Sequence, residues 1–420
     1  MPADDKTETM LSPYRALDLT DEKGLLCGKI LGDMGADVIK LEKPGGDAAR
    51  SIGPYYHDEP HPEKSLFWFS LNTSKRGITL DIETADGREI FKKLVKTADF
   101  VIESFPPGYL DKLGLDYTSL NKIKPGIILV SITPFGQTGP YRDYKTSDIV
   151  AWALSGEMSG WGDIDRPPVR ISHHSQSYLN AAADGAIGAL VALNQRWSTG
   201  KGQQIDVSIQ EALSIMDGDN RNPAWSRNPG TVRKRGEPAM AGAGHRTTRL
   251  FACKDGYVSW SHGGVSVLAP SLPLIKWMQA EGMSNEFLDN FDWSRPDFGA
   301  ISQEEMDNIE GATAKFFMTK TKAELLEGAI KRDVMLYPVA TTADMFDDVQ
   351  LKARGFWVEV EHPELGVTIT YPGAFGLCSE TPPKISRRAP LIGEHNREIY
   401  EGELGITKEK LAVLKEAGVI

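Results

Sequence analysis

The stretch from Leu31 to Glu42, LGDMGADVIKLE, ends one predicted helix and contains the next predicted strand. Apolar residues at near-helical spacing predict a helix over residues 24–34, and Gly35 ends it. Residues 37–41, DVIKL, then form a strand pattern, and residues 16–19, ALDL, form another before the helix. This order of elements predicts a β-α-β unit at the start of the fold.

The same alternation continues along the first half of the chain. Further strands are predicted over residues 78–82, 99–103, 127–133 and 204–207, and helices over residues 87–96, 109–113, 117–122, 177–197 and 210–216. Alternating strands and helices favour a parallel sheet that is covered by helices on both faces. Ligands of such α/β sheets bind at the carboxyl ends of the strands.

The chain changes character after residue 216, which predicts a division into domains. We expect residues 1–216 to form the first part of a large α/β domain and residues 217–244, rich in Pro and Gly, to form a linker and glycine loop. A smaller α+β domain follows over residues 245–330, beginning with a hairpin that turns at Asp255-Gly256. Residues 331–420 are expected to return to the large domain.

Composition excludes several classes of protein. There are 47 Lys and Arg against 58 Asp and Glu, a net charge of −11 that argues against nucleic acid as the main partner. No apolar run is long enough to span a bilayer, and the polar segment 1–13 lacks a signal core, so we expect a cytoplasmic protein. Cys27, Cys253 and Cys378 lie far apart, which argues against a zinc site or a disulfide framework.

Motifs for nucleotide, hydrolase or metal sites are missing from the sequence. There is no GxGxxG after a strand, no P-loop, no GxSxG and no HExxH. His173 and His174 are adjacent and would point to opposite faces of a strand, so we expect hydrogen bonding or loop packing rather than metal binding. Basic residues recur near predicted strand ends, namely Lys40, Lys43, Lys75, Arg76, Lys112 and Lys145. They are either solvated surface charges or a ring of cations for the phosphates of a nucleotide-like carrier.

Eight segments, taken in their order and spacing, carry a resemblance to a known family. They are LDLT (17–20), LGDMGADVIKLE (31–42), LNTSKR (71–76), FPPG (105–108), KLGL (112–115), FGQTGP (135–140), TGKGQ (199–203) and PLIGEH (390–395). With them the chain resembles the class III CoA-transferases, the family of formyl-CoA transferase and carnitine CoA-transferase, over nearly its whole length.

The resemblance implies a Rossmann-like large domain, a smaller domain and two chains interlocked as a dimer. It implies a CoA thioester as substrate and no tightly bound cofactor. The positions that match family CoA contacts are Leu71, Lys75, Ser104, Phe105, Tyr109, Lys112 and Lys145. Ser104 replaces a common Asn and Lys112 a common Arg, and Lys is the poorer bidentate partner of a phosphate.

The family reaction needs an aspartate nucleophile, and its position in this chain is Tyr178. In the family the Asp attacks the donor thioester and then carries CoA as an aspartyl thioester. No acid occurs in residues 175–179, and the nearest one, Asp184, comes nearly two helical turns later. The turn at residues 22–25, EKGL, also lacks the family's proline.

Four hypotheses about the function follow from this resemblance. The first is a subunit that lacks the nucleophile and pairs with a paralogue that carries it, with the glycine loop of Gly242 and Gly244 as a lid. Within the family, the likeness is strongest to one subunit of the succinyl-CoA:(R)-benzylsuccinate CoA-transferases of anaerobic toluene degradation. The second is a homodimeric transferase with Asp184 as a shifted nucleophile. The third is a CoA-thioester racemase or isomerase using His173 or His174 with Asp184, and a non-enzymatic CoA-binding protein is a further class.

Overall fold

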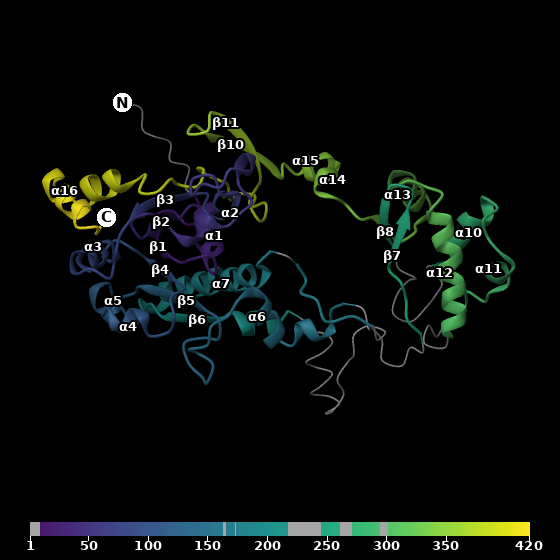
Figure 1. Cartoon of the computed structure of the whole chain (residues 1–420), viewed down its shortest axis with the longest axis horizontal. Helices are drawn as coiled ribbons and strands as arrows, with labels where there is room; N and C mark the ends of the chain where they lie inside the picture. The colour runs from purple at the N-terminus through teal and green to yellow at the C-terminus, as the bar shows by residue number, and fades with distance from the viewer. Residues whose placement is uncertain (1–8, 163–164, 173, 217–244, 261–270, 295–300) are drawn as a thin grey trace. The chain divides into compact units, whose positions relative to one another are not determined.

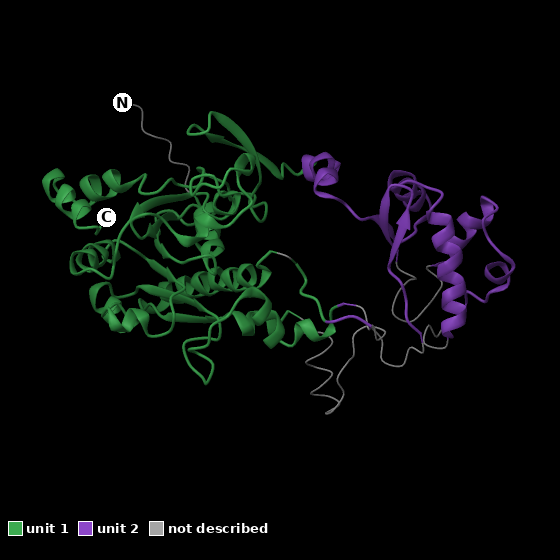
Figure 2. Cartoon of the chain, viewed as in Figure 1, with its two compact units in different colours: residues 1–161, 168–232, 353–420 green, residues 162–167, 233–352 purple. Residues whose placement is uncertain are grey.

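The computed structural model of the chain describes residues 9–162, 165–172, 174–216, 245–260, 271–294 and 301–420. The chain divides into two compact units (Figure 2). The large unit is Met1–Trp161, Pro168–Val232 and Ala353–Ile420, and the small unit is Gly162–Pro167 and Arg233–Lys352.

A six-stranded sheet in the order β3-β2-β1-β4-β5-β6 organises the large unit (Figure 1). Its strands are β1 (Arg15–Leu19), β2 (Asp37–Glu42), β3 (Lys75–Thr79), β4 (Phe100–Glu103), β5 (Ile128–Thr133) and β6 (Gln204–Ser208), and every pairing is parallel. The predicted α/β class is therefore confirmed. The strand order reverses between β1 and β4, and such a switch point opens a crevice at the carboxyl ends of the strands.

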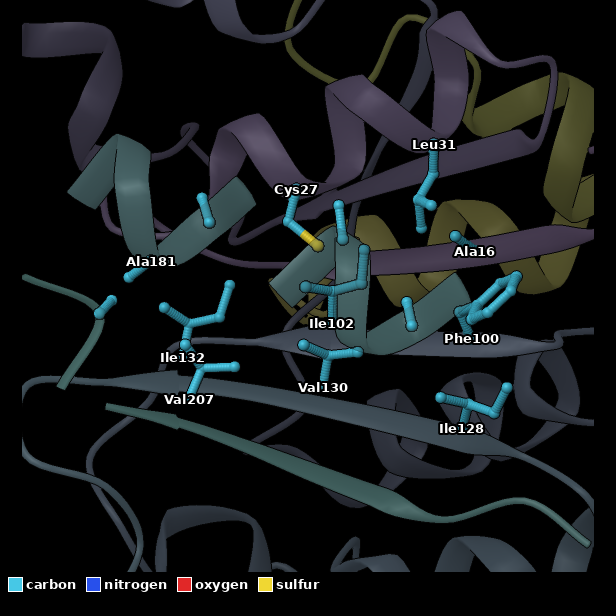
Figure 3. Close-up of a cluster of buried hydrophobic side chains, with 14 of the residues drawn as sticks. Ala16, Cys27, Leu31, Phe100, Ile102, Ile128, Val130, Ile132, Ala181 and Val207 are labelled. Atoms are coloured by element: carbon cyan, nitrogen blue, oxygen red, sulfur yellow. The ribbon is translucent and has the colours of Figure 1, made fainter. Parts of the chain in front are cut away.

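Helices cover both faces of this sheet, as its apolar strands require. One face packs against α1 (Leu25–Asp33), α6 (Asp148–Leu154), α7 (Gln176–Thr199) and α8 (Ile209–Ser214). The other packs against α3 (Ala85–Val95), α4 (Tyr109–Lys112), α5 (Tyr117–Ile123) and α16 (Lys408–Glu416). Figure 3 shows the first of these cores, where Ile102 and Val130 of the sheet lie near Cys27 of α1.

An outer layer completes the large unit. Helix α2 (Leu66–Leu71) packs its Trp68 and Phe69 against the hairpin of β10 (Trp357–His362) and β11 (Val367–Pro372). The C-terminal segment then runs past the end of β3, where the Tyr400 hydroxyl donates to the Thr79 carbonyl oxygen at 2.6 Å. Residues from both ends of the sequence therefore build one unit.

The small unit contains a three-stranded antiparallel sheet and several helices. The strands are β7 (Leu250–Cys253), β8 (Gly256–Trp260) and β9 (Leu336–Pro338), which confirms the predicted hairpin. The helices are α10 (Leu272–Ala280), α11 (Glu286–Asn290), α12 (Gln303–Phe317), α13 (Lys322–Arg332), α14 (Thr342–Asp347) and α15 (Val349–Ala353), the last of which ends at the unit boundary. The return to the large unit comes at residue 353 instead of the expected 331, because β9 pairs with β8.

The third strand differs from its prediction. The strand was expected over residues 78–82, whereas β3 begins at Lys75 and ends at Thr79. Its first two residues are cations that the sheet buries, because Lys75 meets Asp18 at 2.8 Å and Arg76 meets Asp37 at 2.6 Å. Ion pairs between distant residues thus override the polar appearance of this segment. Within the described residues, none of the helices has the length and apolarity to cross a bilayer.

Candidate functional site

A cavity of about 340 Å³ lies at the switch point of the sheet. We call it the switch-point cavity. It is lined by Leu19, Asp21, Leu41, Glu42, Lys43, Gly46, Asp47, Ala48, Leu80, Ile82, Ser104, Phe105 and Tyr109. These residues end or follow β1, β2, β3 and β4, so the cavity occupies the edge at which an α/β sheet binds its ligand.

Apolar and aromatic groups form much of the cavity wall. The Phe105 and Tyr109 rings stack with centroids 4.4 Å apart and planes inclined by 25°. The Tyr109 hydroxyl donates to Glu83 at 2.7 Å, and Lys43 meets the same carboxylate at 3.0 Å. Burial and the Glu83 carboxylate raise the pKa of Tyr109, so the phenol remains neutral. Such a cavity suits a flat heteroaromatic ring, with the ammonium of Lys43 available at its rim.

Three of the seven predicted CoA contacts meet in this cavity. Ser104 and Phe105 follow β4, and Tyr109 begins α4. Lys112 lies exposed at the end of α4, and Lys145 lies exposed in the segment before α6. Neither lines the cavity, and their contact with CoA stays a prediction.

The other two predicted contacts are buried elsewhere. Leu71 ends α2 within the outer apolar cluster. The ammonium of Lys75 is fully buried and donates to Asp18 at 2.8 Å, to Asn72 at 3.0 Å and to the Leu25 carbonyl oxygen at 2.8 Å. These bonds use all three of its donors, so a contact with CoA would require one of them to be exchanged.

The basic residues near the strand ends do not form a ring of cations for phosphates, and not all of them are solvated surface charges. Lys40 and Lys75 are fully buried in ion pairs, and Arg76 is bonded at the opposite end of the sheet to Asp37. Lys43 reaches the cavity rim, where it already meets Glu83. Three of the six basic residues therefore stabilise the sheet through ion pairs, and the other three are exposed.

Tyr178, which the resemblance places at the position of the nucleophile, lies in the first turn of α7. Tyr178 is only 4% exposed there and packs into the core that α7 shares with the sheet. Asp148 caps this helix by accepting from the backbone N–H of Ser177 at 3.0 Å and from its hydroxyl at 2.6 Å. Burial, followed by the charges of Glu22, Asp148 and Asp21, raises the pKa of Tyr178. The side chain at this position is thus a neutral phenol at physiological pH.

The alternative catalytic groups do not converge on this position. Asp184 lies six residues along α7 from Tyr178, which is about 9 Å of helical rise, and burial raises its pKa. His174 is exposed just before α7, on the opposite side of Tyr178 in sequence. His173, Gly242 and Gly244 fall outside the described residues, so their predicted roles stay predictions.

Leu80 and Ile82 are site residues that sequence reasoning missed. Both were placed inside the expected strand 78–82, whereas the strand ends at Thr79 and both line the cavity. Asp21 and Ala48 were also missed. These residues could have been predicted from one feature, because residues that directly follow a strand of a parallel sheet lie at its ligand-binding end.

Comparison with known proteins agrees with this architecture. Residues 11–396 match the model described as CoA-transferase family III. The chain is 35% identical over 393 residues to the succinyl-CoA:(R)-benzylsuccinate CoA-transferase subunit BbsE of Thauera aromatica, covering 92% of this chain and 93% of that protein. It is 32% identical over 400 residues to the succinyl-CoA–D-citramalate CoA-transferase of Chloroflexus aurantiacus, covering 94% of each.

Among solved structures, a CaiB/BaiF family protein from Brucella suis is similar with a TM-score of 0.79 and 29% identity. The match covers 94% of this chain and 99% of that one. Family model, relatives and structure thus all extend over nearly the entire chain. The chain belongs to CoA-transferase family III and is a CoA-transferase.

Proposed function

We propose that this chain is one subunit of a hetero-oligomeric CoA-transferase whose paralogous partner carries the catalytic aspartate. The complex would move CoA from succinyl-CoA to an aryl-succinate such as (R)-benzylsuccinate, in an interlocked arrangement of the two chains. BbsE is named as a subunit of an enzyme with that reaction, and this supports both the partner and the substrate. CoA serves as a substrate group and not as a resident cofactor.

The observation that carries the proposal is the chemistry of Tyr178. Acyl transfer in this family requires a carboxylate that attacks a thioester and later releases CoA. A phenol whose pKa is raised by burial and by neighbouring carboxylates is not an anion at neutral pH. It therefore cannot take that role, while the switch-point cavity beside β1 and β4 is fully formed.

We propose that the switch-point cavity receives the CoA thioester. Its stacked Phe105 and Tyr109 offer an aromatic wall for the adenine ring, and Lys43 offers a cation for a phosphate. Isothermal calorimetry with CoA tests this part. Phe105→Ala should weaken binding by about 1–3 kcal/mol, the usual contribution of one base stacked on an aromatic ring. An unchanged affinity would place CoA elsewhere.

The subunit hypothesis is tested by assaying succinyl-CoA transfer with and without the paralogue. The purified chain should be inactive, and co-expression with the paralogue should restore transfer. In the complex, Asp184→Asn should leave the rate unchanged, since Asp184 lies about two turns into α7. Activity of the lone chain that disappears in Asp184→Asn would show instead that the nucleophile has shifted, and proton exchange at the α-carbon in deuterated water would indicate an isomerase.

A further inference from the structure

Two loops line the switch-point cavity. One follows β1 and contributes Asp21, and the other follows β2 and contributes Asp47. A change in the distance between these loops would change the shape of the cavity. The groups that hold the two loops are therefore of interest even where they do not touch the ligand.

One buried ammonium contacts both loops. Lys40 of β2 is 0% exposed, and its Nζ donates to the Thr20 carbonyl oxygen, one residue before Asp21. The same Nζ lies 3.2 Å from Oδ2 of Asp47. Burial alone would lower the pKa of Lys40, but the carboxylates of Asp47, Asp18 and Glu42 raise it, so the bridge is charged.

Two carboxylates form further hydrogen bonds to the loops. Asp18 accepts from the Thr20 backbone N–H at 2.9 Å and from its hydroxyl at 2.6 Å. Glu42 accepts from the Asp47 backbone N–H at 2.8 Å. Each loop is thus hydrogen-bonded to a carboxylate from the strand that precedes it, and Lys40 contacts both loops.

A second link joins the first loop to β4 across the switch point. The Ser104 hydroxyl accepts from the Asp21 backbone N–H at 2.9 Å and donates to the Asp21 carboxylate at 2.8 Å. The loop that Lys40 holds on one side is therefore held by Ser104 on the other. A shift at Lys40 would be transmitted to the lining residue Asp21.

The buried cations near the cavity are all paired with carboxylates. Lys40, Lys75 and Arg50 lie beside Asp18, Glu42, Asp47 and Glu63. Removing one cation leaves an uncompensated buried carboxylate, and such a charge draws in water or moves. The cavity floor consequently depends on each member of the set.

We propose that Lys40 is a positioning residue of the CoA-thioester site, which sets the distance between the two loops without contacting the ligand. This inference rests on the proposed function of the cavity. A purely structural residue at the same burial would change stability and leave CoA affinity as it was. Measuring both CoA affinity and thermal stability in the same variant therefore distinguishes a positioning role from a purely structural one.

The test compares Lys40→Met with Arg76→Met in the full chain purified with its co-expressed partner. Arg76 is also buried and is bonded to Asp37 and Glu398 at 2.6 Å each. Its partner Asp37 is the first residue of β2, so this ion pair lies toward the amino-terminal end of the strands, and Arg76 does not line the cavity. Calorimetry with CoA should show binding weakened about tenfold in Lys40→Met, because small misplacements of site residues have effects of that size or larger. Arg76→Met should lose thermal stability and bind CoA within about twofold of the wild type.

Hydrogen exchange provides a readout that does not require ligand. In Lys40→Met the amides of residues 19–22 and 46–49 should exchange faster, and in Arg76→Met they should not. Wild-type affinity for CoA in folded Lys40→Met would overturn the inference. If the wild type itself bound no CoA, the proposed role of the cavity would fail, and unchanged exchange in Lys40→Met would then overturn the positioning role separately.

A milder variant keeps the test decisive if Lys40→Met does not fold. Asp47→Asn retains the Oδ1 that accepts from the Ala49 backbone N–H at 2.8 Å and removes the charge that faces Lys40. CoA binding should weaken about threefold, since one of two loop contacts is reduced rather than removed. Unaltered binding in Asp47→Asn would contradict the inference.

Discussion

The resemblance predicts that Lys75 contacts CoA, whereas the structure places it in a buried ion pair. Replacing Lys75 by methionine tests whether its main role is to stabilise the fold or to bind CoA. The Lys75 ammonium and the Asp18 carboxylate are both 0% exposed and lie 2.8 Å apart. Burial would raise the pKa of Asp18, but Lys75 and Lys40 hold it below its usual value, so Asp18 is ionised. Methionine fills a similar volume and leaves that carboxylate with one cation fewer.

The magnitude follows from the cost of an orphaned buried charge. Breaking a buried pair by removing one partner costs about 3–5 kcal/mol of unfolding free energy. At roughly 2–4 °C per kcal/mol for a chain of this size class, Tm should fall by about 6–20 °C. Adding Asp18→Asn to Lys75→Met removes the orphaned charge and should recover about 1–3 kcal/mol.

The assay is thermal unfolding followed by circular dichroism, with CoA calorimetry on the same samples below Tm. Lys92→Met is the control, because the pair of Glu89 and Lys92 within α3 is exposed to solvent and should contribute little to stability. A Tm of Lys75→Met within about 2 °C of the wild type would refute the reasoning. So would a lost CoA affinity at unchanged Tm, which would make Lys75 a direct contact.

Three further changes test other parts of the structure. Burial, with the charges of Asp206 and Asp21, raises the pKa of Glu103 to about 7, so the folded state binds its proton more tightly than the unfolded state. Stability should therefore fall by roughly 3 kcal/mol between pH 4.5 and 7, and Glu103→Gln should flatten that part of the Tm profile. Tyr178→Phe should leave transfer by the complex within about twofold, since the phenol is not ionised, and a tenfold loss would contradict this. Gly28→Ala should destabilise the fold by about 1–3 kcal/mol in urea unfolding, because its Cβ would lie 2.2 Å from the Asp18 carboxylate.

The sequence was sufficient for elements that are determined by local pattern. Residues 127–133, IILVSIT, are a nearly continuous apolar run, and most of them form β5, a strand that is buried on both faces. A run of this kind has few alternatives in a globular protein. β3 was displaced by three residues, because its burial of Lys75 and Arg76 depends on carboxylates that are far away in the sequence.

The error at β3 also explains what was missed in the site. Placing the strand over residues 78–82 put Leu80 and Ile82 in the sheet, although they lie past its carboxyl end in the cavity wall. Phe105 and Tyr109 were found through family motifs, since a pair of stacked aromatic residues has no distinctive spacing of its own. The β-α alternation predicted a parallel sheet that binds its ligand at the carboxyl ends of the strands. The location of the switch point could not be predicted without the strand order.

The switch-point cavity and the predicted nucleophile position depend on different parts of the chain. All lining residues fall between Leu19 and Tyr109. Tyr178 lies in the first turn of α7 and belongs to the apolar cluster that also contains Ile132 and Ala181. A buried aromatic ring stabilises that core by about 1.5–3 kcal/mol relative to exposure. An aspartate at this position would leave a void and add a fourth carboxylate beside Asp148 and its acidic neighbours. The first turn of α7 is thus built for packing, which agrees with the proposal that a partner chain supplies the nucleophile.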